Sequence, residues 1–262
     1  MVEFNYGSEL PLKDELLRSV EPSVCPVNVA IAVAGIVGSN DVTRTVRKDL
    51  EVLADSVRSH DIVEVMDAFK TEGFPSDPSL LSEIDRNRID VALRQKSGNP
   101  ITLAMILAGV ASQIDLDCVG INFPQHFLVR IDRKLIDPLH MRIVTPAEMR
   151  AWAKRKGIDR TPLFSRATNR DIALRMLNNV RLALGGRDRH VDALRVLDYK
   201  ALLADDSPEV LVEKSEVWLD LGDSGMAKEL LEQALELIES PSFKDMVRKR
   251  IHLLRGSKVE LN

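Results

Sequence analysis

Residues 97–139, SGNPITLAMILAGVASQIDLDCVGINFPQHFLVRIDRKLIDPL, decide the fold of this chain because they join one apolar helix to a run of strands. The segment 100–114 is apolar except for Thr102, Ser112 and Gln113. A helix without a polar face must be covered on all sides by the rest of the protein. Asn99 can accept a main-chain hydrogen bond as N-cap, and Pro100 suits the first helical position. The sequence therefore predicts a buried central helix that begins at Pro100.

Three short β-strands are expected after this helix, at residues 119–123, 127–131 and 134–137. A two-residue hairpin loop at 132–133 would pair Ile131 with Lys134, Val129 with Ile136, and Leu128 with Asp137. Because side chains alternate between faces, His126, Leu128 and Asp137 then share one face, with His126 and Asp137 as diagonal neighbours. An imidazole beside a carboxylate is the base and orienting group of a nucleophile triad. The same spacing also fits a purely structural His–Asp pair.

The motifs around these residues resemble the core of the transglutaminase-like superfamily. In that family a Gly-x-Cys begins the buried helix, a His begins a strand, and an Asp-Pro ends the next strand. The matching residues here are Gly98-Asn99-Pro100, His126 and Asp137-Pro138. The pattern is most similar to that of bacterial transglutaminase-like proteins of the SirB type, whose linker into a tetratricopeptide-like tail resembles residues 175–179. The resemblance covers about residues 85–240.

The resemblance implies that the nucleophilic cysteine of enzymatic relatives corresponds to Pro100, which has no reactive atom. Thiolate chemistry needs a sulfur atom at the helix N-terminus, where the dipole and a nearby imidazole lower its pKa. Cys118 lies at the start of a predicted strand, and Cys25 lies in a separate N-terminal segment. Thr102 remains near the position, either as a replacement nucleophile or as a hydroxyl bonded back to a helix carbonyl. The sequence therefore predicts a triad that keeps its base and its orienting group but has lost its nucleophile.

Composition is typical of a soluble globular protein, with 45% hydrophobic and 29% charged residues. The formal net charge of −4 predicts no general attraction to nucleic acid, and no phosphate-binding glycine loop precedes a helix. The two cysteines are predicted to be reduced thiols of a cytoplasmic protein, with a Cys25–Cys118 disulfide as the alternative. No cofactor or metal ion is expected, because His126, Asp137 and His140 lack the ligand spacing of a zinc site.

The N-terminal part is predicted to be helical and to carry no site chemistry. The expected helices are 12–20, 27–37, 42–57, 62–69 and 78–96. The apolar run 26–37 is too short to span a bilayer, and the acidic residues among the first twenty give the wrong sign of charge for the n-region of a secretory signal. We therefore expect no membrane association.

The C-terminal part is predicted to consist of helical repeats. A capping box at 145–148 starts a helix to about Gly157, and from Asn169 onward apolar residues recur 34 residues apart. The matched pairs are Leu177 and Leu211, Leu184 and Trp218, Ala193 and Ala227, Leu197 and Leu231, and Leu203 and Leu237. That spacing is the period of a tetratricopeptide helix pair, with a last helix at 243–254 as end cap.

The fold class expected is α+β: a papain/transglutaminase-like core with a small antiparallel sheet, a helical N-terminal part and tetratricopeptide-like helical hairpins. The expected domains are 1–162 and 163–262. The first functional hypothesis is a non-catalytic interaction or regulatory module that binds a protein or peptide partner through its C-terminal repeats. The alternative is a hydrolase or acyltransferase in which His126 and Asp137 act as general base on water or on Thr102. Pro100 at the nucleophile position favours the non-catalytic hypothesis.

Overall fold

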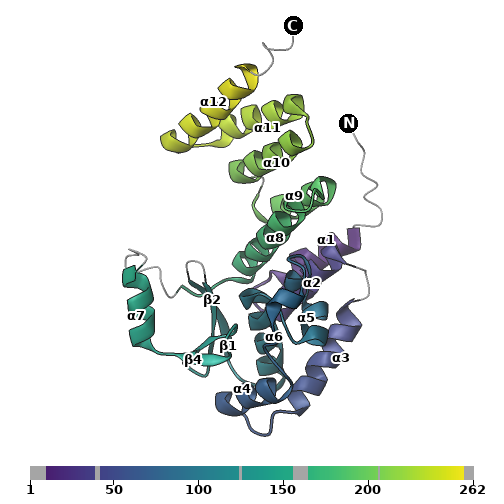
Figure 1. Cartoon of the computed structure of the whole chain (residues 1–262), viewed down its shortest axis with the longest axis vertical. Coiled ribbons are helices and arrows are strands. Elements are labelled where there is room, and N and C mark those ends of the chain that lie inside the picture. The colour runs from purple at the N-terminus through teal and green to yellow at the C-terminus, as the bar shows by residue number, and fades with distance from the viewer. Residues whose placement is uncertain (1–9, 39–41, 124–125, 156–164, 206, 257–262) are drawn as a thin grey trace. The chain divides into compact units, whose positions relative to one another are not determined.

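A computed structural model describes residues 10–38, 42–123, 126–155, 165–205 and 207–256. Within these ranges the chain forms twelve α-helices and one four-stranded antiparallel sheet (Figure 1). The predicted α+β class, mostly helical with a small antiparallel sheet, is confirmed. The chain divides into two compact units, Met1–Met176 and Leu177–Asn262. The domain boundary expected between residues 162 and 163 lies outside the described residues.

The central helix of the first unit is α6, Pro100–Gln113, and every residue from Ile101 to Ala111 is buried. Three other helices pack against it: α2 (Val27–Val37), α3 (Val42–Asp55) and α5 (Ile89–Gln95). Close packing depends on Gly109, because an added Cβ would lie 3.0 Å from side-chain atoms of Leu50 and Val27. The predicted buried helix is therefore present, and it is enclosed by helices from the N-terminal part.

The remaining N-terminal helices are α1 (Leu10–Ser19) and α4 (Ile62–Thr71). The single helix predicted over residues 78–96 is wrong, because two short 3-10 helices, Pro78–Leu80 and Asp85–Asn87, precede α5. The Ser82 hydroxyl accepts a hydrogen bond from the main-chain N–H of Asp85 and donates one to its carboxylate. Such local side-chain bonds compete with continuous helical hydrogen bonding and break the segment into short turns.

The sheet has the order β1–β2–β3–β4, with strands Cys118–Phe123, His126–Ile131, Lys134–Asp137 and Arg142–Val144. Both residues of the loop between β2 and β3, Asp132 and Arg133, have positive φ, as a tight two-residue hairpin requires. The predicted pairs Ile131–Lys134 and Val129–Ile136 are present. The short edge strand β4 was not predicted from the sequence.

The two faces of the sheet are covered by different helices, α6 on one side and α7 (Pro146–Arg155) on the other (Figure 1). β2 contacts α6, and its residues Phe127, Val129 and Ile131 are buried. The opposite face and α7 form a separate apolar cluster: Val119, Ile121, Phe123, Leu128, Val144, Met149 and Ala153. His126 alternates with Phe127 and is therefore on the α7 side of the sheet.

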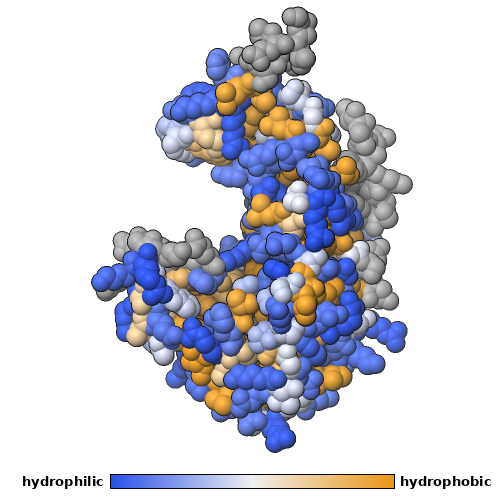
Figure 2. All heavy atoms as spheres, in the orientation of Figure 1, coloured by the Kyte–Doolittle hydropathy of each residue, from blue (hydrophilic) through white to orange (hydrophobic). Residues whose placement is uncertain are grey.

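The C-terminal part is helical, with α8 (Asn169–Gly185), α9 (His190–Leu203), α10 (Pro208–Asp220), α11 (Ser224–Leu237) and α12 (Pro241–Gly256). α9 and α11 begin 34 residues apart, and the matched residues Ala193 and Ala227 are fully buried. The assignment of these helices to the tetratricopeptide class stays a prediction. Figure 2 shows that hydrophilic side chains cover most of the visible surface of both units.

Candidate functional site

His126 is held by aromatic side chains on the α7 side of the sheet. Its imidazole stacks on Trp152 of α7, with ring centroids 5.0 Å apart and an interplanar angle of 16°. It also meets Phe123 of β1 at 5.9 Å in a tilted arrangement. The residue is exposed, and its side chain forms no hydrogen bond with any residue that the structure describes. The position of this ring is therefore set by stacking and not by a carboxylate.

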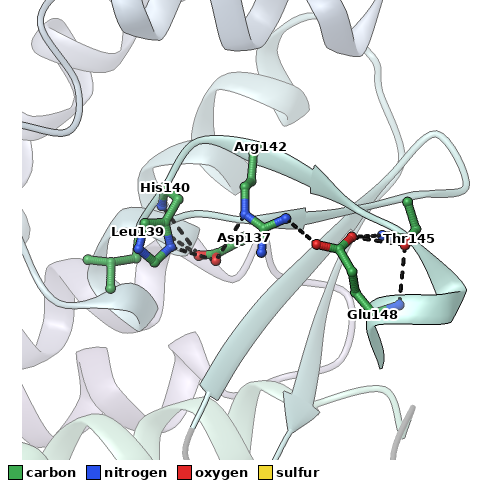
Figure 3. A network of polar contacts seen from close by, with 6 residues as sticks. All are labelled: Asp137, Leu139, His140, Arg142, Thr145 and Glu148. Atoms are coloured by element: carbon green, nitrogen blue, oxygen red, sulfur yellow. Dashed lines mark hydrogen bonds and ion pairs between the residues drawn. The ribbon is translucent and has the colours of Figure 1, made fainter. Parts of the chain in front are cut away.

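Asp137, at the end of β3, is buried and organises the turn that follows it (Figure 3). Its Oδ1 atom accepts hydrogen bonds from the main-chain N–H groups of Leu139 at 3.0 Å and His140 at 3.3 Å. Its Oδ2 atom lies 2.7 Å from Nδ1 of His140 and 3.9 Å from Nε of Arg142. The imidazole that this carboxylate orients is thus that of His140, whose side chain is 63% exposed.

A second carboxylate continues this network to the N-terminus of α7 (Figure 3). Glu148 accepts hydrogen bonds from Thr145, through both its main-chain N–H and its hydroxyl, and from Arg142 at 2.6 Å. The main-chain bond from Thr145, together with the side-chain bonds from Arg142 and Thr145, lowers the pKa of Glu148 to about 2. The Arg142 guanidinium also lies 6.0 Å from the ring of Trp152. Ionic and aromatic contacts therefore link the Asp137 turn to the helix that carries the His126 stack.

His126 and Asp137 share a sheet face, as the sequence predicts, but their side chains are not in direct contact through a hydrogen bond in the described part of the chain. Continuing the observed register by one residue places Leu128 opposite Asp137, as the sequence predicts. No hydrogen bond joins the two side chains in the described part of the chain, because the Asp137 carboxylate is used by its own turn. His140 is only three residues away, so a tight turn brings its ring to the carboxylate at little entropic cost.

The N-terminal end of α6 is built for capping. The Asn99 side chain accepts a hydrogen bond from the N–H of Thr102 at 2.9 Å and donates one to Asn87 Oδ1 at 2.6 Å. Pro100 occupies the first turn of the helix, as predicted. The Thr102 side chain is fully buried, and its hydroxyl has no hydrogen-bond partner among the described residues. The bond from this hydroxyl to a helix carbonyl, weighed from the sequence, is therefore not present.

The two thiols lie elsewhere, and both are free. Cys25 Sγ is 3.8 Å from the carbonyl oxygen of Ala108, in the second half of α6. Cys118 begins β1, where burial, followed by the nearby Cys25 and Asp117, raises the pKa of its thiol. A thiol with a raised pKa stays protonated near neutral pH and is a poor nucleophile.

Arg175 of α8 fixes the start of β2 from the other side of the sheet. Its guanidinium donates a hydrogen bond to the main-chain carbonyl of His126 at 3.1 Å and lies 5.4 Å from the ring of Phe127. Burial lowers the pKa of Arg175. The residue is the first of the segment 175–179 that resembles the SirB-type linker, and it joins α8 to the start of β2.

Comparison with known protein families identifies the family of this chain. A family model described as the transglutaminase-like superfamily matches residues 41–178, more than half of the chain. The chain belongs to the transglutaminase-like superfamily. The matched region of this transglutaminase-like protein includes Pro100, His126 and Asp137, and also His140.

Its relatives include bacterial proteins of the predicted SirB type, which confirms that resemblance. The chain is 29% identical over 184 residues to a UPF0162 protein of Xylella fastidiosa, covering 66% of each chain. It is 21% identical over 199 residues to Protein SirB1 of Salmonella typhimurium, covering 72% of this chain and 74% of that protein. The match to the Xylella protein thus spans just under two thirds of that relative. No solved structure matches this transglutaminase-like chain.

The residue that sequence reasoning missed in this transglutaminase-like protein is His140, which was considered from the sequence only as a possible metal ligand. The available signal was the spacing Asp-Pro-x-His, since a carboxylate that accepts main-chain bonds in a turn can also reach the side chain three residues later. No group of three or more His, Cys, Asp or Glu residues in the described ranges could hold a metal ion. Among those same residues, no helix is long and apolar enough to cross a membrane.

Proposed function

We propose that this transglutaminase-like protein is non-catalytic and acts as an interaction or regulatory module for a protein partner. The observation that carries the proposal is Pro100 in the first turn of α6, the position where the family resemblance implies a nucleophilic cysteine. The pyrrolidine ring has no atom that can attack a carbonyl carbon. Thioester or acyl-enzyme chemistry of the usual kind therefore has no nucleophile at this position.

The surroundings of Pro100 support the same proposal. Asn99 is engaged as a cap and as a donor to Asn87. Thr102 is the nearest hydroxyl, and it is fully buried. An attacking hydroxyl must reach its substrate and must be hydrogen-bonded to a base. The Thr102 hydroxyl is shielded from solvent, and no described residue accepts a hydrogen bond from it.

The partner is proposed to bind the C-terminal helices, which follow one another as antiparallel neighbours. Successive helices α9, α10, α11 and α12 contact each other in order along the chain. Stacked helix pairs of this kind present extended surfaces that other proteins use for peptide or protein contact. Free thiols at Cys25 and Cys118 fit a reducing compartment such as the cytoplasm.

The test combines a turnover assay with partner capture by the full chain. The purified protein should hydrolyse or transfer no amide or ester substrate, and it should capture a defined partner in stoichiometric amount. Replacing the exposed Leu237 and Leu253 of the C-terminal helices by Ser should abolish capture. The matched control is Leu80→Ser, an exposed leucine of the N-terminal part, which should leave capture unchanged. Turnover that disappears in a His126→Ala or His140→Ala variant would contradict the proposal.

The alternative function is a hydrolase that uses water as nucleophile, and one observation favours it. The exposed imidazole of His140 is held by the buried carboxylate of Asp137 at 2.7 Å, which is the arrangement of an oriented general base. In that case His140→Ala should remove turnover, while His126→Ala should retain it. If His126 is the base paired functionally with Asp137, the two variants should exchange their effects.

A further inference from the structure

A cavity of about 360 Å³ lies between the sheet and the N-terminal end of α7. Its apolar lining residues are Ile121, Leu135, Ile143, Val144, Pro146 and Met149. The volume is at the lower end of the range of ligand pockets, roughly 300–1,000 Å³. A space of this size and lining accommodates one large apolar side chain more readily than an extended cofactor. Neither His126 nor Asp137 lines it, and Thr145 is the residue that it shares with the polar network of the candidate site.

The rim of this cavity is positively charged. Arg130, Arg133 and Lys134 line it from the β2–β3 hairpin, and all three side chains are exposed. None of them forms an ion pair with a residue that the structure describes. No carboxylate lines the cavity: Asp132 and its neighbour Asp117 lie outside the lining, and Glu148 is bound by Arg142 and Thr145. The rim therefore attracts an external anion.

We infer that this basic-rimmed cavity binds an acidic peptide segment of a partner protein. One large apolar side chain of the peptide enters the cavity, and flanking carboxylates meet the guanidinium and ammonium groups of the rim. Charge complementarity sets the approach and register, and burial of the apolar side chain adds affinity. The inference rests on the proposed role as an interaction module, and it adds a second surface in the transglutaminase-like unit.

A peptide fits this surface better than a small carboxylic acid. The three cations come from two strands and the loop between them, so they can meet more than one carboxylate. Ile143, which lines the cavity, belongs to β4, an edge strand of the sheet. The outer main-chain groups of β4 bond to no residue in the described ranges. An extended peptide can use such an edge through main-chain hydrogen bonds, which a small acid cannot.

The inference is tested by fluorescence polarisation with the full chain and three labelled probes. The probes are acetylated, amidated pentapeptides with Phe, Leu or Trp at the centre and alternating Asp and Glu on both sides. At least one probe should bind with a Kd below about 1 mM. Replacing its carboxylates by amides, or its central residue by Ser, should weaken binding at least about tenfold. Raising the salt concentration from about 0.05 M to about 0.5 M should weaken it similarly.

Charge-reversal variants locate the binding surface. Arg133→Glu combined with Lys134→Glu should weaken peptide binding at least about tenfold. The matched control reverses Arg150 and Lys154 to Glu, two exposed cations of α7 that do not line the cavity, and should change binding less than about twofold. All four substitutions are at exposed positions, so folding should be preserved, as circular dichroism can verify.

Three results would overturn the inference: no probe binds, both charge-reversal variants weaken binding equally, or an oligonucleotide competes as well as the acidic peptide. These results are distinguishable from failure of the proposed function. Partner capture that persists when no probe binds leaves the interaction module intact and removes only the cavity. Catalytic turnover of an amide would overturn the proposed function, whether or not the probes bind.

Discussion

The N-terminal end of α6 and the turn between β3 and β4 carry the residues that the family resemblance matches to the catalytic residues of enzymatic relatives, and the two regions differ in their contacts. At the start of α6 the polar side chains of Asn99 and Thr102 are a capping group and a fully buried hydroxyl. In the β3–β4 turn, the buried carboxylate of Asp137 is hydrogen-bonded to the exposed imidazole of His140 and forms an ion pair with Arg142. The polar side chains of the first region are used inside the fold, whereas the second region places an ionisable imidazole at the surface.

The comparison shows that a His–Asp contact can serve the structure of a turn. Asp137 accepts two main-chain hydrogen bonds in addition to its bond with His140. Those main-chain bonds close the turn that leads into β4, and this structural role does not depend on catalytic activity. A retained carboxylate is therefore weak support for activity unless its partner imidazole also faces a nucleophile or a bound water.

The largest effect on stability is expected for Asp137→Ala. The substitution leaves two main-chain N–H groups without their acceptor and should lower the free energy of unfolding by about 3 kcal/mol. Asp137→Asn keeps one acceptor oxygen and should cost roughly 1 kcal/mol. Urea denaturation of both variants measures the difference. Equal effects for the two would show that the negative charge, and not the main-chain bonding, is what the turn requires.

The next largest effect is expected at the other region, for Asn99→Ala. It removes the cap of α6 and leaves the buried Asn87 oxygen without its donor, for a combined loss of about 2 kcal/mol. Asn99→Ser retains a capping oxygen but not the amide donor, so it should recover about 1 kcal/mol of this. Thermal and urea denaturation give both values. A Ser variant no more stable than the Ala variant would mean that the contact with Asn87 dominates.

A smaller effect of opposite sign is expected for Thr102→Val. The fully buried hydroxyl has no partner in the described part of the structure, and a methyl group of similar size removes the cost of burying it. The variant should be more stable by about 1 kcal/mol. The same variant distinguishes the non-catalytic module from a hydrolase that uses Thr102 as nucleophile, because valine has no hydroxyl and would end such turnover. Destabilisation would indicate that the hydroxyl makes a hydrogen bond after all.

The sequence was sufficient for features that depend on local patterns. The apolar segment after Pro100 and the hairpin around Asp132–Arg133 were predicted with nearly correct limits, because burial periodicity and turn geometry are local properties. The capping box of Thr145 and Glu148 was predicted for the same reason. Local patterns therefore fixed the central helix, the hairpin register and the start of α7.

Features that depend on competition between partners were not predictable. Periodicity favoured a continuous helix over residues 78–96, but side-chain bonds of Ser82 break it. Strand spacing placed Asp137 beside His126, but it could not show that His140 would compete for the carboxylate or that Trp152 would stack on His126. The spacing of residues in a sequence predicts which side chains share a face of a sheet. It does not predict which of two nearby side chains a carboxylate will bind, because that depends on the three-dimensional arrangement.

The smallest effect concerns the pH dependence of the contact between the β3–β4 turn and α7. The pKa of Glu148 is lowered from 4.5 to about 2, so its bonds to Thr145 and Arg142 favour folding above pH 4.5. That contribution is lost as the pH falls through about 2, and solvent screening keeps it small because the side chain is exposed. As the pH is lowered from 4.5 to about 2, the stability of Glu148→Gln should therefore approach that of the unmodified protein.

Arg142→Gln should raise the pKa of Glu148, measured by side-chain NMR titration, but not fully to 4.5, because Thr145 provides the largest contribution. A complete return to 4.5 would show that Arg142 alone lowers the pKa of Glu148. The shift would then arise from the β3–β4 turn and not from the capping bonds with Thr145 at the start of α7.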